Sequence, residues 1–135
     1  MSDEVEPGVS DQYRKASPWP VFVALGFVIA EVGVVLGLFP IAVGGLLLFG
    51  GTVAGILSEA GYVGRPARSL GAFGVVLLAF GALTVGLNVD AAALTVAGLL
   101  DPAKPFVYRG TAIASAGTIL GAVGLTLRTL GRRSV

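Results

Sequence analysis

The 135-residue chain contains no cysteine and no histidine, and its only methionine is Met1. The absent side chains are those that usually bind zinc, copper, iron–sulfur clusters and haem iron. Their absence also excludes disulfides, thiol chemistry and the commonest general base at neutral pH. We therefore expect a chain that binds no metal ion or redox cofactor and catalyses no reaction by itself.

Charged residues are also scarce, at 13% of the chain, whereas 55% of the residues are hydrophobic and the mean hydropathy is +0.90. Soluble domains carry roughly 25% charged residues. The net charge is only +1, and no basic stripe with interleaved aromatic residues is present, which excludes a nucleic-acid partner. The composition predicts an integral membrane protein that is surrounded by lipids.

Four apolar stretches are each close to the roughly 20 residues that an α-helix needs to cross a bilayer. We predict membrane spans at residues 19–39, 40–57, 70–87 and 109–130. Pro40 separates the first two spans almost without a loop, so they should form a tight antiparallel hairpin. The predicted fold is an all-α integral membrane protein, with four transmembrane helices in an up-down arrangement over residues 19–130.

The segment 88–108, between the third and fourth spans, has an apolar core of only ten residues, 91–100. Ten residues are too few to cross a bilayer as a helix. We interpret this segment as a short interfacial or re-entrant helix. Asp90 is the expected N-cap residue, and Asp101-Pro102 is the expected stop.

The ends of the chain and the distribution of basic residues predict the orientation. Residues 1–18 form a polar, acidic tail without the apolar core of a signal peptide, and residues 131–135 form a basic end. If both termini are cytoplasmic, only Lys104 and Arg109 lie outside, and seven basic residues lie inside. The seven are Arg14, Lys15, Arg65, Arg68, Arg128, Arg132 and Arg133. The positive-inside rule then predicts a multi-pass protein of the plasma membrane with both termini cytoplasmic.

Three amphipathic aromatic residues stand near the predicted ends of the spans: Trp19, Tyr62 and Tyr108. Tryptophan and tyrosine are enriched at membrane–water interfaces, where the ring is shielded and the polar atom meets water. We therefore expect these three side chains to act as anchors at the membrane surface.

Glycine is abundant, with 21 residues in the chain. In lipid, small residues allow helix backbones to approach closely and so to gain dispersion contacts. A stripe along one face of the first span consists of Gly26, Ala30, Gly33 and Gly37. Two GxxxG motifs follow, at Gly51/Gly55 and Gly117/Gly121. We expect these residues to pack helices, either within the chain's own bundle or against a helix of a partner.

Glu31 is the only ionisable residue deep within a predicted span, where a charge costs roughly 2.5–3.5 kcal/mol. Four roles are open: a neutral carboxyl group hydrogen-bonded inside the bundle, a contact with another subunit, a proton path, or a site for a cationic substrate. Ser115 and Thr118 in the fourth span are the best-placed hydroxyl partners. No lysine or arginine lies deep within a predicted span to pair with Glu31, and no second carboxylate lies there to complete a proton relay.

Four short spans with one glutamate in the first span resemble the small multidrug-resistance transporters. In that family such a glutamate binds a drug cation or a proton in a homodimer. The resemblance implies the same role for Glu31. Two positions depart from the family: Phe27 stands where an alanine is usual, and the only tryptophan is Trp19, whereas the family has one in the third span. A small proton-coupled transporter that uses Glu31 is therefore the alternative function.

A second resemblance rests on longer runs of sequence: "MSDEVEPGVSDQYRKASPWPVFVALGF", "EVGVVLGLFP", "VGGLLLFGG" and "AGILSEAGYV". These runs, which cover at least residues 1–64, resemble a family of small membrane proteins of halophilic archaea. Its members are labelled cox-cluster proteins because they are encoded beside cytochrome c oxidase subunits. The resemblance implies a non-catalytic accessory subunit or assembly partner of a haem–copper terminal oxidase. Its partners would be the larger membrane subunits, which would hold the haem and copper.

Overall fold

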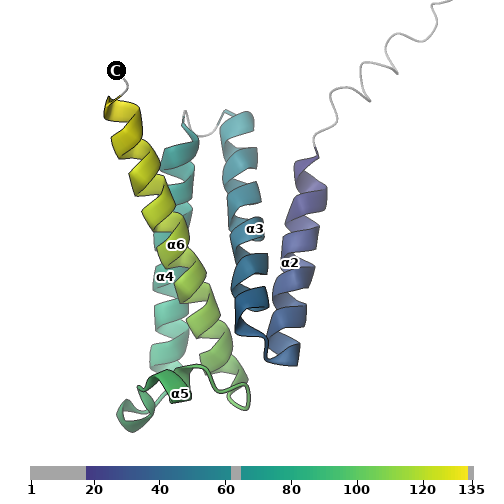
Figure 1. Cartoon of the computed structure of the whole chain (residues 1–135), viewed down its shortest axis with the longest axis vertical. Helices are drawn as coiled ribbons and strands as arrows, with labels where there is room; N and C mark the ends of the chain where they lie inside the picture. The colour runs from purple at the N-terminus through teal and green to yellow at the C-terminus, as the bar shows by residue number, and fades with distance from the viewer. Residues whose placement is uncertain (1–17, 62–64, 134–135) are drawn as a thin grey trace, which may run out of the picture.

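The computed structural model describes residues 18–61 and 65–133 of the chain, and within these residues it contains helices and no strand. The elements, in chain order, are α2 (Trp19–Leu36), α3 (Phe39–Glu59), α4 (Pro66–Asn88), the 3₁₀ turn η1 (Ala91–Ala93), α5 (Val96–Leu99) and α6 (Pro105–Arg133). Among the described residues, four helices are long and apolar enough to cross a membrane: α2, α3, α4 and α6. They run alternately up and down (Figure 1). The predicted all-α, four-span membrane fold is therefore confirmed.

Proline and glycine residues determine where the helices begin and end. Pro20, Pro40 and Pro66 lie in the first turns of α2, α3 and α4, where the missing N–H has no helical partner to lose. Gly37 ends α2 with a left-handed φ of 69°, and the N–H of Leu38 donates to the carbonyl of Gly33 at 2.8 Å. Gly37 was expected in the packing stripe, but it instead forms the turn between α2 and α3.

The four long helices associate as two pairs. α2 packs mainly against α3, α4 packs mainly against α6, and α3 joins the pairs by contacting both α4 and α6. Figure 1 shows α2 at one edge of the bundle, beside α3 and away from α4. This arrangement leaves α2 with one principal neighbour in the chain, and α2 and α6 contact each other little.

In the first pair, the structure places Gly26, Ala30 and Gly33 of α2 in a buried row against α3. A Cβ atom added to Gly33 would lie less than 3.0 Å from backbone atoms of Ala42, and one added to Gly45 would meet the backbone of Ala30 equally closely. The two backbones are therefore in direct contact, which is possible only because small residues stand at these positions.

The backbones of α4 and α6, the second pair, are also in direct contact at glycine residues. Gly117 faces the backbone of Leu78, and Gly74 faces the backbones of Gly117 and Gly121. The motif Gly51/Gly55 has no such role: a Cβ on Gly51 would have no heavy atom within 4 Å, and Gly55 lies under the ring of Trp19. The packing role in α3 falls instead to neighbouring glycines, Gly45 and Gly50.

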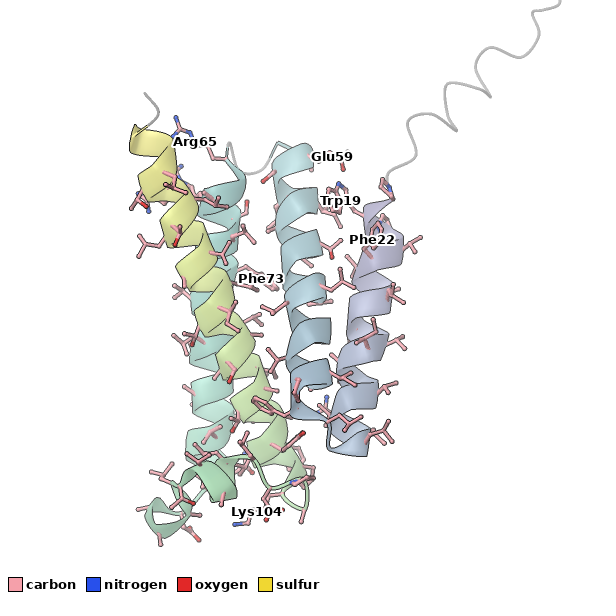
Figure 2. The ribbon with its side chains drawn as sticks, in the orientation of Figure 1. Trp19, Phe22, Glu59, Arg65, Phe73 and Lys104 are labelled. Carbon is pink, nitrogen blue, oxygen red and sulfur yellow. The ribbon has the colours of Figure 1, made fainter. Side chains whose placement is uncertain are left out.

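The three aromatic residues expected at the membrane surface do not share one environment. Trp19, the first residue of α2, lies across Gly55 near the end of α3 (Figure 2). Tyr108 was expected to be an interface anchor, but it is only 1% exposed and packs edge-on against Phe39, with 5.7 Å between ring centroids. Its position on α6 faces the core instead of the surface. Tyr62 lies outside the described residues.

The segment between α4 and α6 contains two short helical pieces, η1 and α5, where one helix over residues 91–100 was expected. Asp90 stands at the expected N-cap position, before η1, but its side chain makes no capping hydrogen bond; Thr95 caps α5, because its hydroxyl oxygen accepts the N–H of Gly98 at 3.0 Å. α5 packs against α6 at the end of the bundle opposite the start of α2 and the end of α6 (Figure 1).

The backbone contact at Gly33 predicts a specific cost for one added methyl group. Gly33→Ala should lower the free energy of unfolding by about 1–3 kcal/mol, because α2 and α3 must separate to admit the new Cβ atom. Gly44→Ala is the matched control, since a Cβ there has open space; it should be neutral or stabilising by up to about 1 kcal/mol. Unfolding in mixed detergent micelles measures both values. Equal effects of the two variants would contradict the backbone contact.

Candidate functional site

The main charged feature within the described helices is an ion pair between Glu31 of α2 and Arg109 of α6. A guanidinium nitrogen of Arg109, Nη1, donates to the carboxylate oxygen Oε1 of Glu31. Because α2 and α6 otherwise contact each other little, this bond connects the first helix pair directly to the second. It joins residues 78 positions apart in the sequence.

This pair corrects the expectation that Glu31 has no basic partner within the spans. Two helix boundaries explain the difference. α6 begins at Pro105, four residues before the predicted start of the fourth span, and α2 ends at Leu36, three residues before the predicted end of the first. At 1.5 Å per residue, both charged residues lie about 6–8 Å inside the ends of their helices, on the same side of the bundle. Pro105 was the sequence signal for the earlier start, because proline favours the first helical turn.

Neither of the hydroxyl groups expected to hold Glu31 forms a hydrogen bond with it in the described structure. The hydroxyl of Thr118 donates to the carbonyl of Ala114 at 2.8 Å, within its own helix. Ser115 lines a shallow pocket of about 390 Å³ between α4, α5 and α6, together with Thr111 and Thr118. The interpretation of Glu31 as a carboxyl group held by these two hydroxyls is therefore wrong.

The ion pair is partly exposed on the protein surface. The side chain of Arg109 is 39% exposed and that of Glu31 is 35% exposed. In a bilayer either charge alone would carry a penalty of roughly 2.5–3.5 kcal/mol at the centre, which falls toward the interface, and pairing offsets that penalty for both. The exposed part of the pair is accessible to a polar group of a neighbouring molecule, but the carboxylate is already bound to a cation.

Tyr108, the residue before Arg109, packs α6 against α3 at the same end of the bundle. Its ring is buried, and its hydroxyl group has no hydrogen-bond partner among residues 18–61 and 65–133. A buried, unpaired hydroxyl costs about 1–3 kcal/mol, so the packing of the ring against Phe39 has to offset that cost. Tyr108 was expected at the membrane surface because a span that begins at residue 109 leaves it outside the helix.

The helices and the charged pair define a small multi-pass membrane protein whose two helix pairs are joined by a bond between Glu31 and Arg109. Comparison of the sequence with protein families identifies it further: the chain belongs to DUF7541, a family of unknown function, whose model matches residues 1–130. No curated protein and no solved structure matches the chain.

The ion pair predicts strong coupling between its two residues. Glu31→Gln or Arg109→Gln alone should lower the free energy of unfolding by about 2 kcal/mol, because each leaves an unpaired charge among the helices. The double variant should be at least as stable as either single variant, since it leaves no charge unpaired. Unfolding in mixed detergent micelles gives the double-mutant cycle.

Lys104→Gln is the control for this cycle, because it removes an exposed positive charge at the same end of the bundle (Figure 2). It should change the free energy of unfolding by less than about 0.5 kcal/mol. If the effects of Glu31→Gln and Arg109→Gln simply add in the double variant, the two residues do not interact in the folded protein.

Proposed function

We propose that this protein is a non-catalytic accessory subunit, or an assembly partner, of a haem–copper terminal oxidase of the cytochrome c oxidase type. The observation that carries the proposal is the resemblance of residues 1–64 to the cox-cluster membrane proteins of halophilic archaea. The composition is consistent with this role: a chain without histidine or cysteine would join such an enzyme as a part that leaves haem and copper to larger subunits.

The outer face of α2 supplies a surface on which a larger subunit would pack. α2 buries a narrow row of small residues against α3, and most of its remaining surface is apolar and exposed. The exposed side chains include Val21, Leu25, Val28, Val32 and Val35. Because α2 lies at the edge of the bundle, a transmembrane helix of a partner has access to this face without disturbing α3 (Figure 1).

In this role the chain acts through packing alone. Close backbone contacts make two helix pairs, and the contacts of α3 with α4 and α6 join the pairs together with the Glu31–Arg109 bond. A firm, cofactor-free bundle beside the catalytic subunits would exclude lipid from their surface and stabilise their helices. The exposed part of the ion pair would offer a polar contact to the partner at one side of the membrane.

The contact between Arg109 and Glu31 favours the subunit over the proton-coupled transporter. A transporter of the multidrug type needs a carboxylate that accepts either a proton or a cationic substrate. Here the carboxylate of Glu31 is bound to the guanidinium of Arg109, so substrate would have to displace an arginine that belongs to the same chain.

The proposal includes a location and an orientation: the plasma membrane, with both termini in the cytoplasm. Because the four long helices alternate, the start of α2 and the end of α6 lie at the same end of the bundle (Figure 1). The described basic residues Arg65, Arg68 and Arg128 lie near this end, as the positive-inside rule requires of a cytoplasmic side.

Purification from native membranes tests the proposed function. The protein, tagged after Val135 and extracted in a mild detergent, should retain large oxidase subunits in fixed ratio and show their haem spectrum. The same tagged chain, produced in a host without the oxidase, is the control and should be colourless. A colourless homodimer from native membranes would contradict the proposal and direct attention to transport assays on Glu31.

A further inference from the structure

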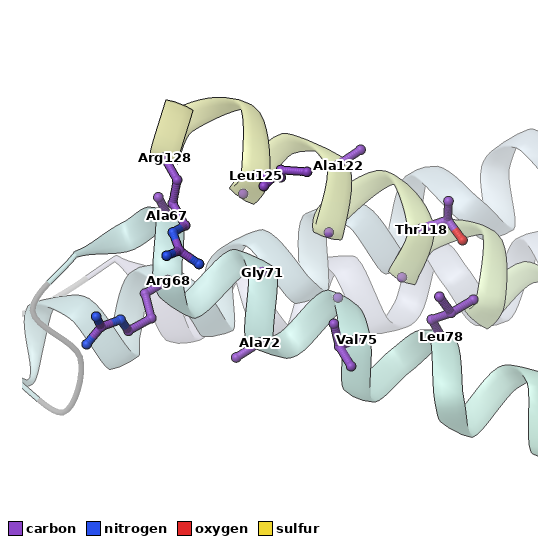
Figure 3. Close-up of a pocket in the computed structure, with 14 residues that line it drawn as sticks. Ala67, Arg68, Gly71, Ala72, Val75, Leu78, Thr118, Ala122, Leu125 and Arg128 are labelled. Atoms are coloured by element: carbon purple, nitrogen blue, oxygen red, sulfur yellow. The ribbon is translucent and has the colours of Figure 1, made fainter. Parts of the chain in front are cut away.

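A long groove of about 570 Å³ runs along the outside of the α4–α6 pair (Figure 3). Its walls are built from small residues, including Gly71 and Ala72 of α4 and Gly121 and Ala122 of α6. A Cβ atom added to Gly71 or Gly121 would have no heavy atom within 4 Å. Gly74 and Gly117 therefore let the helix backbones touch, whereas Gly71 and Gly121 leave an empty groove on the outer side.

The groove has the length of one bilayer leaflet. It extends from Ala67 to Leu78 along α4 and from Arg128 to Gly117 along α6. At 1.5 Å per residue these stretches are about 16 Å long, and the hydrocarbon core of a bilayer is roughly 30 Å thick. The hydroxyl of Thr118 is already bonded to Ala114, so the deep part of the groove presents an apolar surface.

Two arginines line one end of this apolar groove. Arg68 is in the first turn of α4, and Arg128 is near the end of α6. Figure 3 shows Arg128 extending from α6 toward the start of α4, with Arg68 at the same end. Across the two described ranges, 18–61 and 65–133, no carboxylate forms an ion pair with either guanidinium group. The end of the groove therefore carries two positive charges available to an anionic group.

We propose that this groove binds an anionic phospholipid, with one hydrocarbon chain in the trough and the phosphate between Arg68 and Arg128. The guanidinium group is suited to phosphate because its N–H donors can bind two oxygens at once. Basic pockets between transmembrane helices commonly hold anionic lipid headgroups. A second copy of the chain fits less well, because a dimer axis along the membrane normal would bring the four arginines of two copies together.

Native mass spectrometry of the full chain, purified in detergent, tests this site. The probes are phosphatidylglycerol and phosphatidylcholine with identical acyl chains, and glycerol 3-phosphate as a headgroup without chains. Wild-type protein should retain phosphatidylglycerol in preference to phosphatidylcholine and should not retain glycerol 3-phosphate. Because each basic residue near an anionic group is worth roughly a fivefold change in affinity, the double variant Arg68→Gln/Arg128→Gln should lose about 25-fold in phosphatidylglycerol binding.

The apolar part of the site has its own variant. Gly121→Leu should fill the trough and weaken retention of both lipids, whereas Gly44→Leu, which adds the same side chain to open space on α3, should have no effect. Lys104→Gln is the control for charge and should leave the lipid preference unchanged. Thermal unfolding should show that all variants are folded.

Three results would overturn the lipid site. The first is equal retention of the two phospholipids by the wild-type protein, and the second is an unchanged preference in the double arginine variant. The third is a dimer that disappears in Gly121→Leu while lipid binding is unaffected, because that result would assign the groove to a second copy. This test does not depend on the oxidase, since both walls of the groove belong to this chain.

Discussion

Direct contact between helix backbones is the constraint on which this structure depends. In lipid, burying an apolar side chain gains little, because lipid tails are as apolar as the protein interior. What remains is dispersion between closely packed atoms, which weakens steeply when surfaces separate by even 1 Å. Glycines such as Gly33, Gly45 and Gly117 remove the side chains that would hold the backbones apart. These contacts fix the register of both helix pairs.

The register of the helices in turn brings two distant charges together. α3 lies against both α4 and α6, so the position of α2 on α3 determines what α2 presents to α6. Glu31 and Arg109 meet at that place and satisfy each other. In α4 and α6 the lack of side chains at Gly71 and Gly121 also leaves a groove on the outer surface. This groove ends beside Arg68 and Arg128. Small residues thus shape both the interior and one outer surface.

Much of the fold follows from composition and the lengths of the apolar runs, because a membrane span demands about 20 apolar residues whatever its neighbours are. The stripe of Gly26, Ala30 and Gly33 likewise follows from helical periodicity, and the structure places it against α3. The pairing of Glu31 could not be predicted. It depends on helix ends, which a hydropathy pattern locates only to within a few residues. The end of α2 was predicted three residues too late, which placed Glu31 too deep, and the start of α6 was predicted four residues too late, which placed Arg109 outside the membrane.

The glycine motifs show a second limit. Spacing marks Gly51/Gly55 and Gly117/Gly121 as equivalent, yet of these four only Gly117 would bring a Cβ atom against the backbone of a neighbouring helix. Which face of α3 meets a neighbour is decided by the whole bundle, and the sequence of one helix does not contain that information. Tyr108 is similar, since its helical phase follows from the start of α6 at Pro105.

Solid-state NMR of the protein in lipid bilayers tests the central contact most directly. With ¹⁵N in the arginine guanidinium groups and ¹³C in the glutamate carboxyl groups, dipolar coupling reports an ion pair without altering either residue. The structure predicts a coupling at salt-bridge distance that is present in the wild-type protein and absent from Glu31→Gln. If the spectrum shows no coupling that depends on Glu31, then Arg109 does not bind Glu31 in the membrane, which would contradict the structure.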